Sequence, residues 1–171
     1  MHCPAGPPRL AEMRRGNIAA IVLVAIATFG AATAQAATPS KHLSGAARSL
    51  LVAINSARAT AGVAPLRATG KLTSAASWQS EVLARAGYLD HTSPDGSTLV
   101  DRLTRVRWTG TAAGEDLAVA PDPASAVSMW MQSPGHRENL LRASFRTVGL
   151  GLARGVWNGR PALYVTADFA S

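Results

Sequence analysis

The sequence predicts an α+β domain, with helices through most of its length and strands near its end. Between residues 43 and 131, apolar side chains recur every three or four positions, as one buried face of a helix requires. Between residues 147 and 169 the pattern changes to two short runs rich in Val, Leu and Gly, separated by Asn158 and Gly159. An Asn-Gly pair between two such runs is a strong hairpin signal. Helices followed by a terminal hairpin are typical of α+β proteins.

Five helical segments are expected from this spacing. They cover residues 44–61, 73–86, 99–106, 123–131 and, as a short turn or helix, 138–142. Ser44 is a suitable N-cap for the first segment, and Asp122 is suitable for the fourth, which begins with a proline. Gly87 offers the left-handed conformation that ends the second. Pro134 and Gly135 are expected to form a tight turn that stops the fourth helix and carries the next histidine.

The remaining segments are expected to be extended or looped. Strands are predicted over residues 147–153 and 163–169, and extended backbone over 63–66 and 108–113. Residues 88–97 form a predicted loop, because Pro94, Asp95 and Gly96 are turn-forming residues. The sequence contains no internal repeat.

The first 36 residues have the order of a secretory signal peptide. Arg14 and Arg15 precede an apolar run over residues 18–32, and Ala34 and Ala36 place small side chains at a cleavage site. The run is shorter than the ~20 residues of a membrane-spanning helix. We expect residues 1–36 to direct the chain transiently to the membrane and then be removed; an uncleaved N-terminal anchor is the alternative. Either route would place the remainder outside the cytoplasmic membrane, secreted or periplasmic.

The exported part is expected to consist of a linker over residues 37–45 and one domain over 46–171. It contains 14 basic and 9 acidic residues, which are scattered along the chain. Few aromatic residues lie among the basic ones, so nucleic acid is not an expected partner. A modest positive charge instead suits an acidic envelope or anionic lipid surface. We expect a monomer whose partner is an envelope, lipid or protein ligand.

Cysteine usage excludes several kinds of chemistry. The one cysteine, Cys3, lies within the expected signal peptide. The exported domain therefore has no disulfide and no thiolate for catalysis or zinc binding, and its stability must come from its apolar core.

Three residues are the best candidates for a functional site: His91 and His136, which lie in predicted loops, and Glu115, which lies among small residues. Two imidazoles and a carboxylate are suitable ligands for a divalent metal, with zinc expected first. Glu115 could instead accept an imidazole N–H and fix its tautomer, or act as a general base toward a water molecule. Spacing alone is a weak signal, because no His-Glu-x-x-His helix is present. Two loop histidines are more often ordinary hydrogen-bonding residues.

Asp116, Ser133 and Arg137 are expected to line the same cleft, since each is next to or near a candidate in sequence. A serine hydrolase is a remote alternative, because no Gly-x-Ser-x-Gly elbow accompanies the serines. Trp78 and Trp130 lie on helical apolar stripes and are expected to be core residues.

A set of motifs through the chain resembles the CAP superfamily, the SCP-like domain of cysteine-rich secretory proteins, antigen 5 and plant pathogenesis-related proteins. The bacterial, disulfide-free branch is the most similar, and the resemblance covers residues 50–169. The motifs are Leu51-x-x-x-Asn55-x-x-Arg58, Pro65-Leu66, Asp90-His91, Gly114-Glu115-Asp116-Leu117-Ala118, Trp130-Met131-x-Ser133-Pro134-Gly135-His136-Arg137-x-Asn139-Leu140-Leu141, Val148-Gly149-x-Gly151 and Thr166-x-x-Phe169.

The resemblance implies an α-β-α three-layer sandwich with a central, mainly antiparallel sheet. It also implies a cleft with two histidines and two acidic residues, where some family members bind a divalent metal. His91, Glu115 and His136 match three of these four positions. Ser133 stands where many members have the second acid, and Asp116 replaces the asparagine that usually follows the glutamate.

Three functions stay open at this point, and the sequence does not decide whether the protein is an enzyme. The first is a secreted binding or interaction module of the envelope or extracellular space, with a His/Glu cleft suited to a divalent metal. The second is a metal-dependent, peptidase-like hydrolase in which Glu115 is the general base and the histidines are ligands. The third is a lipid- or sterol-binding protein. A shared fold does not choose among them.

Overall fold

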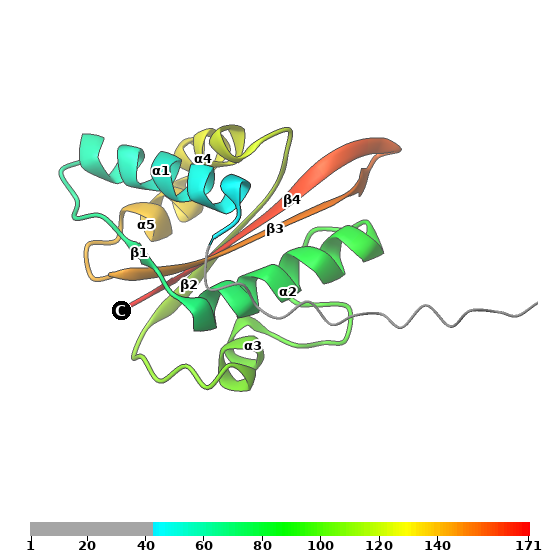
Figure 1. The fold of residues 1–171 in the computed structure, drawn as a ribbon, viewed down its shortest axis with the longest axis horizontal. Helices are drawn as coiled ribbons and strands as arrows, with labels where there is room; N and C mark the ends of the chain where they lie inside the picture. The colour runs from blue at the N-terminus through cyan, green and yellow to red at the C-terminus, as the bar shows by residue number, and fades with distance from the viewer. Residues whose placement is uncertain (1–42) are drawn as a thin grey trace, which may run out of the picture. The chain divides into compact units, whose positions relative to one another are not determined.

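The computed structural model describes residues 43–171, so the expected signal peptide and most of the expected linker lie outside the described residues. Residues 43–171 belong to one compact unit. The described part contains five α-helices and four strands (Figure 1). In chain order they are α1 Gly45–Thr60, β1 Arg67–Ala68, α2 Gly70–Ala86, α3 Leu99–Arg105, β2 Ala113–Ala120, α4 Pro123–Gln132, α5 Pro134–Leu141, β3 Thr147–Trp157 and β4 Arg160–Ala170.

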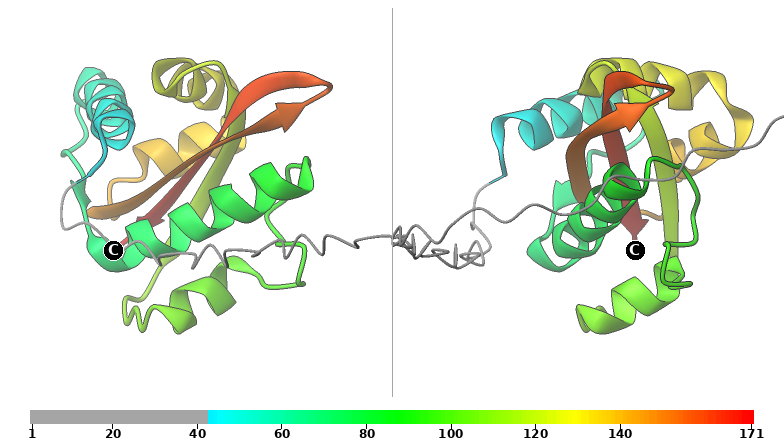
Figure 2. Two further views of the ribbon diagram at one scale, coloured as in Figure 1. Left: turned by 45° about the vertical axis from the view of Figure 1, so that its right-hand side comes forward. Right: turned by 90° about the vertical axis from the view of Figure 1, so that its right-hand side faces the viewer.

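The strands form one sheet in the order β1-β3-β4-β2, which makes β2 an edge strand. The short β1 runs parallel to β3, and the other two pairings are antiparallel. α1, α4 and α5 cover one face of the sheet, while α2, with α3 beyond it, covers the other (Figures 1 and 2). The expected α-β-α sandwich with a mainly antiparallel sheet is confirmed.

Local signals place most of the elements correctly. The Ser44 hydroxyl accepts a hydrogen bond from the Ala47 amide at 3.2 Å, and Asp122 accepts one from the Ser125 amide at 2.9 Å. The Asn158-Gly159 hairpin also forms, because both residues adopt the positive φ values, 49° and 75°, that such a turn requires.

Two expectations about the chain's second half were wrong. Pro134 and Gly135 do not form a turn outside a helix: α5 begins at Pro134, so His136 lies in its first helical turn. A proline at the first helical position loses no hydrogen bond, and its ring presets φ. Residues 108–112 lie outside the strands, and the strand instead runs over Ala113–Ala120. Pairing with β4, a long-range interaction, decides that position.

A large apolar core fills the space between the sheet and the α1/α4/α5 layer. Its largest members are Leu50, Ile54, Trp130, Phe145 and Phe169, each at most 1% exposed. This confirms Trp130 as a core residue. Trp130 also donates its indole N–H to the Leu117 carbonyl at 3.0 Å, which ties α4 to β2.

Arg58 fastens the end of α5 to α1 from inside this layer. Its guanidinium donates to the carbonyls of Ala64 and Leu140, both at 2.7 Å, and to those of Arg142 and Phe145, both at 3.2 Å. The side chain is fully buried without a carboxylate partner. Four carbonyl acceptors satisfy its donors, so α5 and its candidate histidine are held in a defined place.

On the opposite face, α2 packs directly against the backbone of β3. A Cβ atom at Gly149 would collide with the backbone of Leu72, and one at Gly151 with the backbone of Ala76. Only glycine permits this approach at either position. Alternate glycines in β3 therefore set the distance between α2 and the sheet.

Candidate functional site

The site is built around β2, the edge strand that carries Glu115 and Asp116. Adjacent residues of a strand point to opposite faces. Glu115 lies on the α2/α3 face, in register with Asp168 of β4, and Asp116 lies on the α5 face. Both are buried, with 6% and 0% of their surface exposed. The edge position allows groups from the two helical layers to meet at the same strand.

Glu115 is bound at both carboxylate oxygens. Oε1 lies 2.8 Å from Nδ1 of His91, which confirms that these two candidates are in contact. Oε2 accepts a hydrogen bond from Nη2 of Arg102 in a buried ion pair. A carboxylate held at both oxygens by charged donors has a fixed orientation.

Arg102 is a site residue that the sequence analysis did not identify. It is 1% exposed and comes from α3. Besides Glu115, its guanidinium donates to the His91 carbonyl at 3.2 Å and to the Ser93 hydroxyl at 3.0 Å. One side chain therefore positions both the carboxylate and the loop that carries His91. An arginine on the apolar stripe of a short helix was the available signal.

His91 is the exposed end of this chain of contacts, with 61% of its side chain accessible to solvent. The hydrogen bond to Glu115 raises the pKa of His91; burial opposes this effect, and the negative charges of Glu115, Asp90 and Asp116 add to it. The ring therefore keeps its proton to a higher pH than an ordinary histidine. Nδ1 is occupied by Glu115, so Nε2 is the atom available to a ligand.

His136 has a different environment on the first turn of α5. Its Nδ1 lies 2.9 Å from the Ser133 hydroxyl. Burial lowers the pKa of His136, and the charge of His91 lowers it further. The two imidazoles thus affect each other electrostatically although no hydrogen bond joins them in the described structure. The pKa shifts have opposite directions, so His91 keeps its proton to a higher pH than His136.

Asp116 meets α5 on the other side of β2. Its Oδ1 accepts a hydrogen bond from Nδ2 of Asn139 at 3.0 Å. Burial raises the pKa of Asp116 to about 7, against the opposing effects of Asn139 and the His91 charge. The resemblance implies that an asparagine is more usual at this position in the family, and an asparagine has no titratable group.

Asp168 is a second residue that the sequence analysis did not identify. It is fully buried in β4, in register with Glu115 on one side and Gly149 on the other. Burial, and then the charge of Glu115, raise the pKa of Asp168 well above its usual range. Both of its carboxyl oxygens are buried and have no hydrogen-bond partner among the described residues. An aspartate inside an otherwise apolar strand was the signal that could have found it.

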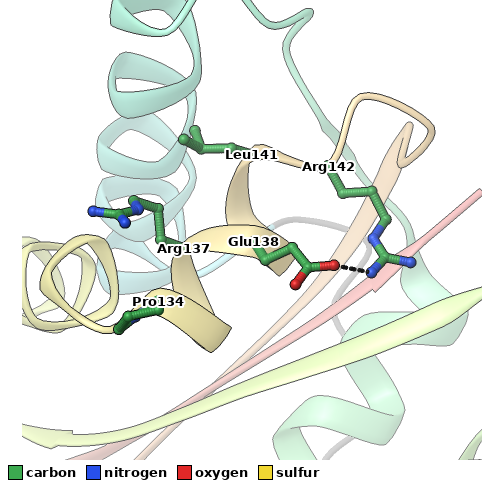
Figure 3. A pocket seen from close by; sticks show the side chains of 5 residues that line it. All are labelled: Pro134, Arg137, Glu138, Leu141 and Arg142. Atoms are coloured by element: carbon green, nitrogen blue, oxygen red, sulfur yellow. Dashed lines mark hydrogen bonds and ion pairs between the residues drawn. The ribbon is translucent and has the colours of Figure 1, made fainter.

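Arg137, which we expected in the same cleft, lies on a different surface. It lines a depression of about 440 Å³ on α5, together with Pro134, Glu138, Leu141 and Arg142 (Figure 3). Across this depression Arg142 donates to Glu138 at 2.7 Å. This ion pair joins residues one helical turn apart.

His91, Glu115 and His136 do not suit a metal site in which all three side chains coordinate the ion. Among residues 43–171, no group of three or more His, Cys, Asp or Glu side chains has the geometry to hold a metal ion. Both oxygens of Glu115 are already bound. The geometry instead resembles an outer-shell carboxylate that orients an imidazole. The Nε2 atoms of His91 and His136 are the remaining nitrogen donors, and metal binding stays a prediction.

The α-β-α sandwich and the His91–Glu115 pair beside His136 together define an SCP-like domain. The family model described as the cysteine-rich secretory protein family, CAP, matches residues 51–169, and the chain belongs to this family. It has a single cysteine, outside the matched region, so the domain has no disulfide.

Relatives in Bacillus subtilis (strain 168) share part of the sequence. The protein YkwD is 32% identical over 98 residues, which are 57% of this chain and 38% of YkwD. The membrane protein YlbC is 31% identical over 108 residues, 63% of this chain and 31% of YlbC. The chain thus spans less than half the length of either relative.

Solved structures give the same fold. An extracellular SCP-domain protein from Bacillus anthracis str. Ames has a TM-score of 0.63 and 28% identity, over 77% of this chain and 45% of that one. An outer surface protein from Borrelia burgdorferi has a TM-score of 0.61 and 20% identity, over 72% of this chain and 90% of that one. Within residues 43–171, no helix has both the length and the apolar character needed to cross a membrane.

Proposed function

We propose that this CAP domain is a secreted or envelope-located binding module that recognises anionic groups through His91 and His136. The observation that carries the proposal is the closed set of contacts around Glu115, which holds the exposed ring of His91 and raises its pKa, while the pKa of His136 is lowered. Extracellular and surface proteins among the structural neighbours support the location.

Preorganisation is the physical reason why this arrangement favours binding. Glu115 and Arg102 are buried and satisfy each other, so the imidazole of His91 needs little ordering when a ligand arrives. The protonated ring can donate Nε2–H to an anionic oxygen, while His136 can accept or donate at its own Nε2. A positively charged domain adds long-range attraction to an acidic surface.

The same contacts weigh against Glu115 as the general base of a hydrolase. A base must reach the proton that it removes. Both oxygens of Glu115 already accept hydrogen bonds, and breaking the contact with Arg102 would leave a buried charge without its partner. Metal-dependent hydrolysis stays an alternative. Substrate turnover that requires a metal and is lost in Glu115→Gln would support it.

If a divalent metal binds here, the Nε2 atoms of His91 and His136 would be its protein ligands. Glu115 would not touch the metal but would fix the tautomer of His91 through Nδ1. A bound zinc would supply Lewis-acid polarisation of a ligand oxygen. Lipid or sterol binding also stays a prediction, and extraction of lipid from the purified protein tests it.

Cosedimentation with phosphatidylglycerol vesicles tests the proposed function. We expect binding at pH 6 that weakens at pH 8, because His91 loses its positive charge as the pH rises through its raised pKa. A His91→Gln/His136→Gln variant should bind less at pH 6 and lose most of the pH dependence. His42→Gln, which removes the histidine of the expected linker, is the matched control. Equal binding by the wild type and the double variant at pH 6 would contradict the proposal.

Calorimetric titration with zinc distinguishes a metal site at His91 and His136 from a metal-free binding module. Stoichiometric binding that His91→Ala/His136→Ala abolishes, and His42→Ala keeps, would assign a metal to these rings. The titration is done at pH 7.5 because neutral imidazole is the form that binds zinc. If no zinc binds at this pH, the metal alternative is rejected and the metal-free binding module is kept.

A further inference from the structure

A second cavity lies between α2 and α3, away from the exposed ring of His91. Its volume is about 170 Å³, room for roughly five waters. Its lining consists of Ser74, Ala75 and Trp78 from α2, Arg102 and Arg105 from α3, and Val106 at the end of α3. The cavity therefore combines apolar side chains with two guanidinium groups.

Trp78 and Arg105 form one wall of the cavity. The Arg105 guanidinium carbon lies 5.1 Å from the centre of the Trp78 ring, a cation–π arrangement that orders both side chains. Arg105 makes one side-chain hydrogen bond, from Nη2 to Asp95 at 3.4 Å, and this ion pair is half exposed. A guanidinium has five N–H donors, so most of those on Arg105 are available to a ligand.

Arg102 provides the second observation. It is 1% exposed, and its Nη1 and Nη2 atoms are committed to Glu115 and to the loop that carries His91. Its Nε is buried and has no hydrogen-bond partner among the described residues. A buried donor without an acceptor is unfavourable, and native proteins usually supply one from protein, water or ligand.

We infer that the cavity between α2 and α3 binds a small organic carboxylate. The carboxylate would accept hydrogen bonds from Arg105, while its apolar part packs against Trp78, Ala75 and Val106. A cation is excluded by the two guanidinium groups. A carboxylate gains a charge-assisted hydrogen bond with Arg105 that a neutral molecule cannot form, so the anion is favoured over its uncharged analogue.

This site is independent of the proposed anion binding at His91 and His136, because none of its lining residues is a histidine. Arg102 touches both regions, but its contacts with Glu115 use other nitrogen atoms. The two proposals therefore fail separately: loss of vesicle binding in the histidine variant says nothing about this cavity.

Sodium benzoate is a suitable probe, since it carries one carboxylate on a compact apolar ring. We would follow the indole N–H signals of the ¹⁵N-labelled full-length chain by NMR, with the Trp78 signal assigned by Trp78→Phe. Benzoate should shift the Trp78 signal saturably, with Kd on the order of 1 mM or tighter for a ligand of this size. Benzyl alcohol, an uncharged analogue, should bind at least about tenfold more weakly.

Two variants and one control complete the test. Arg105→Gln should weaken benzoate binding about tenfold by removing the available cation, and Ser74→Phe should block the cavity from its exposed side. Arg85→Gln removes another exposed arginine that lies near the end of α2 and should leave the affinity unchanged. The inference is overturned if benzoate gives no saturable Trp78 shift. It is also overturned if benzyl alcohol binds equally, or if neither Arg105→Gln nor Ser74→Phe weakens benzoate binding.

Discussion

The two faces of the sheet are stabilised in different ways. The face under α1, α4 and α5 buries a continuous set of aliphatic and aromatic side chains that includes Leu50, Trp130 and Phe169. The face under α2 and α3 has smaller apolar clusters, glycine contacts such as that of Gly151, and the buried charge of Glu115.

The two faces therefore have different roles: one mainly stabilises the fold, and the other positions the residues of the site. Apolar burial is non-directional and tolerates small rearrangements. Buried ion pairs and glycine–backbone contacts depend on particular atoms, so they hold a few groups in defined positions. The α2/α3 face positions His91 through such contacts, whereas the opposite face mainly contributes bulk stability and anchors α5.

Removal of the central cation should have the largest effect. Arg102→Met keeps most of the side-chain volume but leaves Glu115 buried without its charged partner. We expect a loss of about 4 kcal/mol in the free energy of unfolding, measured by urea denaturation. Arg85→Met, at a side chain that is 67% exposed, should change it by less than about 0.5 kcal/mol. Similar values for the two variants would show that the buried pair does not organise this face.

A single methyl group should disturb the same face almost as much. In Gly151→Ala, the new Cβ meets the Ala76 backbone, so α2 must move away from β3. We expect a loss of about 3 kcal/mol by the same denaturation measurement. Gly70→Ala, in α2 with open space around its Cα, is the control and should be neutral or stabilising. A tolerated Gly151→Ala would mean that α2 does not depend on this close approach.

Asp116 allows the α5 face to be tested through pH. Its folded-state pKa of about 7 exceeds the ordinary value of 3.8, so the folded protein holds a proton that the unfolded chain has released. Stability must then fall as the pH rises between these values, by about 2.5 kcal/mol from pH 5 to pH 7. Asp116→Asn should make the decrease smaller by about this amount, measured by urea denaturation at both pH values; the raised pKa of Asp168 adds a decrease of the same sign that the variant keeps.

Asp101→Asn provides a control of opposite sign. Hydrogen bonds from Thr98 lower the pKa of Asp101, so its contribution is present above the unfolded pKa and is lost as the pH falls. Asp101→Asn should therefore leave the pH 5 to pH 7 decrease in place. If the loss of stability from pH 5 to pH 7 were as large in Asp116→Asn as in the wild type, Asp116 would not contribute to it.

The smallest effect concerns the two histidines themselves. NMR titration of the ring protons should give a His91 pKa above 6.5 and a His136 pKa below it. Glu115→Gln should lower the pKa of His91 and narrow the difference, because it removes the main cause of the raised value. The stability that protonated His91 contributes is full below its unfolded pKa and is lost as the pH rises through the folded one. An unchanged His91 pKa in this variant would contradict the assigned contact.

Much of the fold could be predicted from local patterns. Ser44 and Asp122 cap helices as expected, and the Asn158-Gly159 turn joins β3 to β4. Their signals act within a few residues, so neighbouring sequence is sufficient to identify them. The start of α5 was misplaced because Pro134 is compatible with both a turn and a first helical position.

The candidate site was only partly accessible in this way. Family motifs identified His91, Glu115 and His136, and their residue types suggested ligands or acid–base groups. The sequence pattern could not show that Arg102 and Asp168 face Glu115, since they lie 13 and 53 positions away in the chain. Those contacts depend on the β2–β4 register and on where α3 packs.

Local patterns were sufficient to predict the α+β class, five helical segments and the terminal hairpin, and the motifs identified His91, Glu115 and His136. Tertiary structure decided the state of those groups: Glu115 is held at both oxygens, His91 is exposed on a buried carboxylate, and Asp116 lies on the opposite face. The reason is physical. Propensities and caps act between neighbours along the chain, whereas burial, ion pairing and pKa depend on which distant residues the fold brings together.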